Sequence, residues 1–167
     1  MIQRFLSAAA LLMAVAGCAS PEPQESAVAE ARKLITSGQA ECVAVKDGRI
    51  AAVERGRGVS PLLNLYTAGP DVLKDAVVVD KVIGRAAGFI IISGGAKAAH
   101  GELISEDAVA LLKRHGIAVS GTRVVPRILN RKMDGLCPLE QSVLGLDDPA
   151  AAMTALRRRA AELQRGR

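Results

Sequence analysis

The stretch Asn130–Glu140 carries the residues of this chain that are best suited to chemistry. Its sequence is Asn-Arg-Lys-Met-Asp-Gly-Leu-Cys-Pro-Leu-Glu, so Cys137 stands just before Pro138, where a helix is expected to begin. Backbone N–H groups at a helix start favour negative charge and therefore stabilise a thiolate. Cys137 is thus a candidate nucleophile, a candidate redox group or one half of a disulfide.

Glu140 lies one helical turn after Cys137 and admits two interpretations. As a chemical group it is a candidate base for the thiol. As a structural group it completes Cys-Pro-Leu-Glu, which has the form of a capping box in which Glu140 accepts a backbone N–H at the helix start. The sequence leaves both interpretations open.

Asn130 and Arg131, in the same loop, could bind a ligand. An amide beside a planar guanidinium suits a carboxylate or a phosphate. The structural alternative is that both residues fasten the loop to neighbouring carbonyl groups. Upstream, Arg55–Gly58 alternates arginine with glycine and could cradle a phosphate, although its spacing fits no phosphate-loop pattern.

Helices and strands alternate along the chain, and these elements must position the loop. Asp47-Gly48 predicts a tight turn between two antiparallel strands. Lys81–Ser93 is expected to be one long buried helix capped by Asp80, because its length outweighs the strand propensity of its isoleucines. The other helices are expected at about 26–37, 60–66, 105–116, 137–144 and from 147 onward, and strands at 42–46, 50–54, 98–104 and 117–125. This order predicts an α/β domain with a mixed sheet covered on both faces.

Residues 1–17 are typical of a bacterial lipoprotein signal peptide. Arg4 gives a short positive region, and Phe5–Val15 is apolar but too short to span a membrane as a mature helix. The small residues before Cys18 predict cleavage at that position and acylation of the cysteine. A lipid on Cys18 would attach the protein to a membrane.

After the signal, residues 18–25 form a polar tether and residues 26–167 a single domain long enough for a hydrophobic core. Ala19 is not the aspartate that retains lipoproteins at the inner membrane. Resemblance to Gram-negative lipoproteins therefore implies the periplasmic side of the envelope, at the outer membrane rather than the inner one.

Two cysteines besides Cys18 remain, Cys42 and Cys137. In an oxidising periplasm such a pair is a disulfide candidate. In the chain-entropy model a Cys42–Cys137 bond would stabilise the fold by about 4–5 kcal/mol, because it closes a long loop. Only the geometry of the fold decides whether the two sulfurs can meet.

The composition argues against nucleic acid as a partner. The net charge of +5 at pH 7 is mild and comes largely from arginines near the C-terminus. One Tyr, two Phe and no Trp leave few side chains on which bases could stack.

Several strings, in their order, resemble the uncharacterised-domain family numbered 1893, a domain of unknown function with a cytidine-deaminase-like fold. They are Val45–Gly48, Gly58–Leu63, Asp80–Ala87, Glu102–Ser105, His115–Ile117, Asn130-Arg131 and Cys137–Glu140. The resemblance covers about residues 26–163. It implies a three-layer α/β/α sandwich with a mixed sheet of about four or five strands, and no established activity.

The resemblance also implies where a site would lie. A zinc deaminase has His-x-Glu at the start of the helix after the first two strands, and Pro-Cys-x-x-Cys elsewhere. Here His100-Gly101-Glu102 falls on a predicted strand and no Cys-x-x-Cys is present, so neither a metal nor another cofactor is expected. Asp80 and Lys81 hold the expected position, Lys81 as an anion anchor or a desolvated amine. The alternative is an N-cap aspartate and a solvated lysine.

Two functions follow from these residues. The first is a zinc-less domain that binds a small anionic or nucleotide-like ligand, with thiol chemistry at Cys137 as an extension. Its candidate catalytic residues are Cys137, Lys81 and Asp80, and its candidate ligand-binding residues are Asn130, Arg131 and Glu140. The second is a non-catalytic envelope interaction module with a structural Cys42–Cys137 disulfide. The sequence leaves open whether the protein is an enzyme and whether it forms a homodimer.

Overall fold

The structure, a computed structural model, describes residues 22–165. The predicted signal peptide, Cys18 and the first part of the tether lie outside the described residues. Within residues 22–165, we find no helix with the length and apolar character needed to cross a membrane.

Five strands form one mixed sheet in the order β2-β1-β3-β4-β5. Their bounds are Cys42–Lys46 (β1), Arg49–Glu54 (β2), Val77–Ile83 (β3), Ala98–Ser105 (β4) and Ala118–Val125 (β5). β1 pairs antiparallel with β2 and β3, whereas β3, β4 and β5 run parallel. Asp47 and Gly48 both have positive φ in the turn between β1 and β2, as the sequence predicted.

Seven helices connect and cover these strands within the described residues. They are Pro23–Thr36 (α1), Ser60–Ala68 (α2), Pro70–Leu73 (α3), Arg85–Ser93 (α4), Glu106–Arg114 (α5), Pro138–Ser142 (α6) and Pro149–Arg165 (α7). α1 begins three residues earlier than expected, inside the predicted tether, because Pro23 is tolerated in the first turn of a helix.

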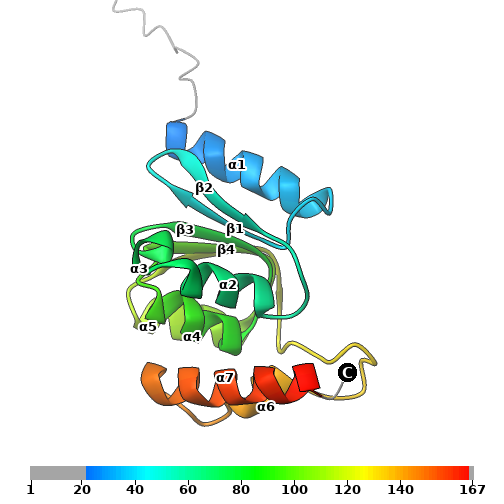
Figure 1. Ribbon diagram of the computed structural model, residues 1–167. Helices are drawn as coiled ribbons and strands as arrows, with labels where there is room; N and C mark the ends of the chain where they lie inside the picture. Colours follow the sequence, from blue (N-terminus) through cyan, green and yellow to red (C-terminus); the bar gives the residue numbers. More distant parts are fainter. Residues whose placement is uncertain (1–21, 166–167) are drawn as a thin grey trace, which may run out of the picture.

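The helices make two layers around the sheet (Figure 1). α1 lies on one face, where its small apolar residues pack on Val43, Val45 and Val79. The other helices lie on the opposite face, and α4 is enclosed between the sheet and α7. Enclosure explains why α4 is apolar around its circumference. The predicted α/β class, three-layer arrangement and mixed sheet are confirmed.

The expectation for Lys81–Ser93 was wrong. Residues 77–83 form β3, and α4 begins only at Arg85, after Gly84. Three consecutive valines, 77–79, favour a strand because branched side chains fit the pleated sheet. Asp80 therefore lies within a strand and caps no helix.

Candidate functional site

A cavity of about 600 Å³ lies beside the carboxyl end of β3 and is the best candidate for a ligand site. Ligands in α/β folds bind outside the carboxyl ends of parallel strands, so the position is a common one. The start of α2, the loop after β5, the start of α6 and the end of α7 enclose it at one side of the molecule (Figure 1). Its lining residues are Arg57, Gly58, Val59, Ser60, Val82, Ile128, Leu129, Asn130, Arg131, Lys132, Cys137, Pro138, Leu139, Ala160, Leu163 and Gln164.

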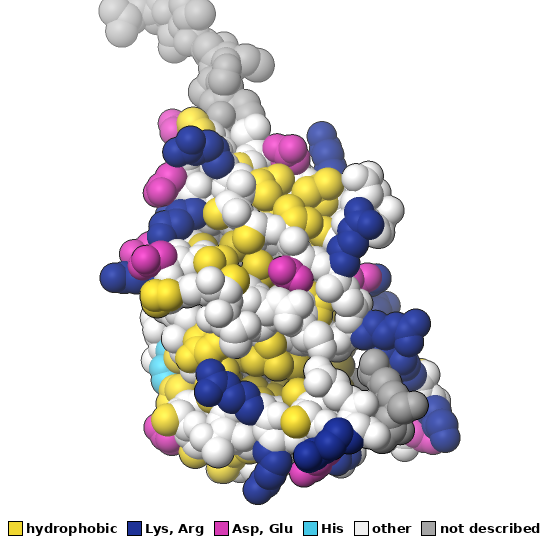
Figure 2. Space-filling view, viewed as in Figure 1, with side chains coloured by type: hydrophobic (Ala, Val, Ile, Leu, Met, Phe, Trp, Pro, Cys, Tyr) yellow, Lys and Arg dark blue, Asp and Glu magenta, His cyan; other side chains and the backbone are white. Residues whose placement is uncertain are grey.

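Three cations stand around this cavity: Arg57, Arg131 and Lys132. All three are exposed, and none forms an ion pair within the described part of the chain. No acidic side chain is among the lining residues. Figure 2 shows basic side chains gathered on the side of the molecule where α7 ends. The cavity therefore favours a negatively charged ligand.

Asn130 organises the loop that forms one wall. Its amide nitrogen donates to Asp134 Oδ1 (2.7 Å), and its Oδ1 accepts from the Asp134 backbone N–H (3.3 Å). Its own backbone N–H donates to Gly135 O (2.8 Å). The structural interpretation of Asn130 fits these bonds, whereas the Arg131 side chain stays available to a ligand.

Cys137 lines the cavity at the start of α6 and is partly exposed. Its backbone N–H donates to Ile128 O (3.0 Å), so Cys137 and Glu140 do not form the predicted capping box. α6 has only five residues and begins with proline, which lacks an N–H. So short a helix gives little reason to expect a thiolate stabilised at its start. Cys137 is a candidate site residue because it lines the cavity.

The candidate Cys42–Cys137 disulfide is not formed: within the described residues, Cys42 and Cys137 are both free thiols. Cys42 is fully buried in β1 beside Asp80. Burial, and then the Asp80 carboxylate, raise the pKa of the Cys42 thiol well above its ordinary value. The alternative function, a non-catalytic interaction module, therefore lacks the disulfide that was part of that hypothesis.

We expect iodoacetamide to alkylate Cys137 in the native protein and to leave Cys42 unmodified until the chain is unfolded. Cys137 is accessible from the cavity, whereas Cys42 has no exposed surface. Peptide mass spectrometry would resolve each cysteine, and Cys137→Ser serves as the control. A Cys42–Cys137 crosslinked peptide in the unreduced protein would contradict the expectation.

Asp80 is buried on the cavity side of β3, next to Cys42. Burial raises the pKa of Asp80 to about 7. The hydrogen bond that its carboxylate accepts from the Val82 backbone N–H (2.9 Å) acts in the opposite direction and lowers this pKa. Val82 itself lines the cavity. Asp80 is therefore a buried proton-binding group close to the cavity, although it is not one of its lining residues.

Lys81 does not share this position. Successive residues of a strand point to opposite faces, so Lys81 lies on the side of the sheet that α1 covers. Its side chain is half exposed, and its ammonium group pairs with Glu41 at 2.9 Å. The positional argument that linked Asp80 and Lys81 also fails, because the helix after the first two strands is α2, which begins at Ser60. The structure does not bring Lys81, Asp80 and Cys137 into one catalytic group.

Glu140 is buried and binds the start of α4. Its two carboxylate oxygens accept from the backbone N–H groups of Arg85 and Ala86, each at 2.9 Å. Burial raises the pKa of Glu140, and the two backbone donors oppose that rise. Because its carboxylate is occupied in this way and Glu140 does not line the cavity, the geometry favours the structural interpretation of Glu140 over a role as a base or a ligand-binding residue. It is a helix cap supplied from a distant part of the chain.

His100 and Glu102 lie on β4, on the sheet face opposite the cavity. His100 Nδ1 is 2.8 Å from Ser120 Oγ, and Glu102 pairs with Arg32 of α1 at 2.9 Å. The Arg32–Glu102 pair joins α1 to β4, and the His100–Ser120 contact joins β4 to β5. Within residues 22–165, no group of three or more His, Cys, Asp or Glu side chains is arranged to hold a metal ion.

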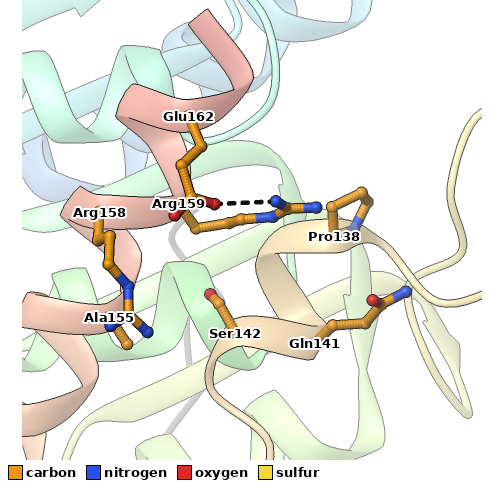
Figure 3. Close-up of a pocket in the computed structure, with 7 residues that line it drawn as sticks. All are labelled: Pro138, Gln141, Ser142, Ala155, Arg158, Arg159 and Glu162. Carbon is orange, nitrogen blue, oxygen red and sulfur yellow. Dashed lines mark hydrogen bonds and ion pairs between the residues drawn. The ribbon is translucent and has the colours of Figure 1, made fainter. Parts of the chain in front are cut away.

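A smaller hollow between α6 and α7 is shown in Figure 3. Arg159 Nη1 pairs with Glu162 Oε2 at 2.9 Å along α7, at the edge of this hollow, while Arg158 extends from the neighbouring position on the same helix. The paired charge and the shallow, partly polar wall make this hollow a weaker candidate than the cavity. Arg158 provides a useful control for experiments on the cavity.

Residues 30–159 match the family model of TM1506, a domain of unknown function (DUF1893). The chain belongs to the DUF1893 family. This confirms the family that the sequence strings resembled. No protein of curated function matches the chain.

Two solved structures resemble this DUF1893 domain. A DUF1893 family protein (TM1506) from Thermotoga maritima has a TM-score of 0.71 and 24% identity, with 83% of this chain and 90% of that chain covered. At this identity the likeness shows the fold alone. A diaminohydroxyphosphoribosylaminopyrimidine deaminase/5-amino-6-(5-phosphoribosylamino)uracil reductase from Thermotoga maritima has a TM-score of 0.45 and 19% identity, with 73% and 41% covered.

The sequence had pointed to part of the cavity of this DUF1893 domain. Cys137 and Arg131 were candidates, and Arg57 belonged to a glycine-arginine segment considered for phosphate binding. Lys132 and the aliphatic wall were missed. Wall residues come from five segments of the chain, and each resembles ordinary core in the sequence.

Proposed function

We propose that this DUF1893 domain binds a small anionic ligand in the cavity, on the periplasmic side of the bacterial envelope, with a lipid on Cys18 as its membrane anchor. The observation that carries the binding proposal is the combination of three cations that form no ion pair within residues 22–165 with an apolar wall and no acidic lining residue. An anion placed there gains charge-assisted hydrogen bonds without facing a nearby lining carboxylate.

The geometry supports a binding role more directly than a catalytic one. Cys137 is the nucleophilic side chain at the cavity wall, and Glu140 is occupied at α4. A reaction at Cys137 would therefore rely on the ligand's own electrophilic group and on the surrounding cations to stabilise a thiolate. Binding of the anion is the step common to both roles.

The test is a fluorescence titration with 8-anilinonaphthalene-1-sulfonate, a probe that joins a sulfonate to an apolar body. We expect saturable binding by the protein and an affinity about tenfold lower for Arg131→Ala, equivalent to about 1.4 kcal/mol. Arg131 borders the cavity, whereas Arg158 lines the other hollow. Arg158→Ala removes the same charge and should leave the affinity unchanged.

Equal losses for Arg131→Ala and Arg158→Ala would mean that the probe responds to overall charge, and the proposed site would be wrong. Failure of the protein to bind the probe saturably would also count against it. Binding that survives in Cys137→Ser would separate the anion site from thiol chemistry.

A further inference from the structure

The wall of the cavity is aliphatic. Val59 comes from the segment before α2, Ile128 and Leu129 from the loop after β5, and Leu163 from the end of α7. Val82, near the end of β3, is 37% exposed, whereas the other apolar residues of this strand are buried. Apolar surface left open in a concave site is a place where an apolar part of a ligand gains free energy by leaving water.

The same wall is poorly suited to a nucleobase. None of the sixteen lining residues is aromatic, so a base would find no ring on which to stack. Of the two lining amides, Asn130 and Gln164, Asn130 already donates to Asp134. Of the two ligand types considered from the sequence, the wall disfavours the nucleotide-like one.

The charged side chains differ from the aliphatic wall in exposure. Arg131 and Lys132 are separated from the apolar pair Ile128-Leu129 by Asn130 alone, and their side chains are exposed while that pair is half-buried. Arg57 is also exposed, at the start of α2. A ligand with one anionic end and one aliphatic end would meet both kinds of surface at once.

The volume limits the number of atoms that such a ligand can place inside the cavity. At about 30 Å³ for each non-hydrogen atom, the share of volume that a water molecule occupies, a cavity of 600 Å³ holds about twenty atoms. A carboxylate with an alkyl chain of about 12–16 carbons falls within this limit.

We propose that the cavity binds a single-chain alkyl carboxylate, with the chain along the aliphatic wall and the carboxylate at Arg131, Lys132 and Arg57. This inference rests on the proposed function and names the class of its ligand. The guanidinium of Arg131 can take both carboxylate oxygens, and the chain needs no polar partner.

The first experiment is isothermal titration of the protein with octanoate, decanoate and dodecanoate, each below its micelle concentration. We expect the affinity to rise about fourfold for each added methylene, the equivalent of about 0.8 kcal/mol per buried CH₂. Dodecanol, which has the chain without the charge, should bind at least tenfold more weakly than dodecanoate. Arg131→Ala should weaken dodecanoate binding and leave dodecanol binding unchanged.

A pair of variants at Leu163 tests the wall. Leu163 is half-buried near the end of α7, so a polar side chain there is compatible with the fold. Leu163→Gln should reduce the gain per methylene, and Leu163→Glu should abolish dodecanoate binding because it adds a carboxylate of like charge. Circular dichroism would verify that both variants are folded. The chain-length series uses the native protein, so it tests the proposal even if these variants do not fold.

Adenosine monophosphate distinguishes this inference from the proposed function. Tighter binding of the nucleotide than of dodecanoate, or affinities independent of chain length, would overturn the alkyl carboxylate and leave an anion site in place. Failure of every anionic probe, 8-anilinonaphthalene-1-sulfonate included, would overturn both.

Discussion

Asp80→Asn is expected to make the protein more stable at pH 8 and to have a much smaller effect near pH 4.5. Burial raises the pKa of Asp80 to about 7, whereas an aspartate in an unfolded chain has a pKa of about 3.9. The folded state therefore holds this proton more tightly than the unfolded state. Its contribution to stability is fully present below about pH 3.9 and is lost as the pH rises through about 7.

The size of the effect follows from the same two values. A difference of about three in pKa corresponds to about 4 kcal/mol, which is the most that ionising Asp80 removes from the free energy of unfolding. Asparagine can still accept the Val82 N–H and can donate to the Cys42 sulfur, so the local bonds are kept. The variant should gain up to this amount over the native protein at pH 8.

Urea unfolding at several pH values between 4.5 and 8 measures this difference. Asp71→Asn is the control, because Asp71 is an exposed carboxylate at the start of α3. The difference between Asp80→Asn and the native protein should grow with pH, while that for Asp71→Asn stays small. A gap that does not change with pH would show that Asp80 does not titrate in this range.

The elements with strong local signals were predictable from the sequence. Asp47-Gly48 fixed the first hairpin because both positions need positive φ. Ser105 caps α5 through its hydroxyl, which accepts from the Ala108 N–H (3.2 Å), and Asp148 caps α7 in the same way through Ala151 (2.8 Å). Caps of this kind act over three residues, so the sequence alone reveals them.

β3 was not predictable on the same grounds. A polar pair, Asp80-Lys81, interrupts its apolar residues and resembles a helix start. What makes the pair compatible with a strand is tertiary: Asp80 is buried beside Cys42, and Lys81 reaches Glu41. Neither contact leaves a pattern in the neighbouring sequence. The local sequence therefore predicts a helix start at Asp80 and Lys81, whereas both residues lie in β3.

The residues of the candidate site likewise differ in how far their roles follow from the local sequence. Arg131 and Cys137 belong to one loop, whose composition drew attention to it and which does border the cavity. Glu140 belongs to the same stretch but turns toward α4, because two unsatisfied N–H groups lie there. Its closeness to Cys137 in the sequence suggested a chemical role for Glu140. Its hydrogen bonds to the start of α4, which is distant in the sequence, favour a structural role.

Glu140→Ala is expected to destabilise the protein by about 3–5 kcal/mol. The substitution leaves the N–H groups of Arg85 and Ala86 without their acceptors in a buried region, and each unmet donor costs about 1–3 kcal/mol. Glu140→Gln keeps one acceptor and turns an amide donor toward the other N–H, so its cost should be about 1–3 kcal/mol. Urea unfolding at pH 7 measures both, with Glu162→Gln, a half-exposed glutamate paired with Arg159, as a control expected to cost less than about 1 kcal/mol.

A double-mutant cycle with Gly84 tests whether the helix cap is the cause. A Cβ at Gly84 would collide with the carboxyl group of Glu140, although the backbone there (φ −98°) accepts any residue. Gly84→Ala should therefore be costly in the native protein, because it pushes the carboxylate away from the start of α4. In the Glu140→Ala background the collision is gone, and the same substitution should cost little. Since the two residues are in contact, their effects should be less than additive by at least about 1 kcal/mol. Additive effects would mean that Glu140 stabilises the fold through contacts other than the start of α4.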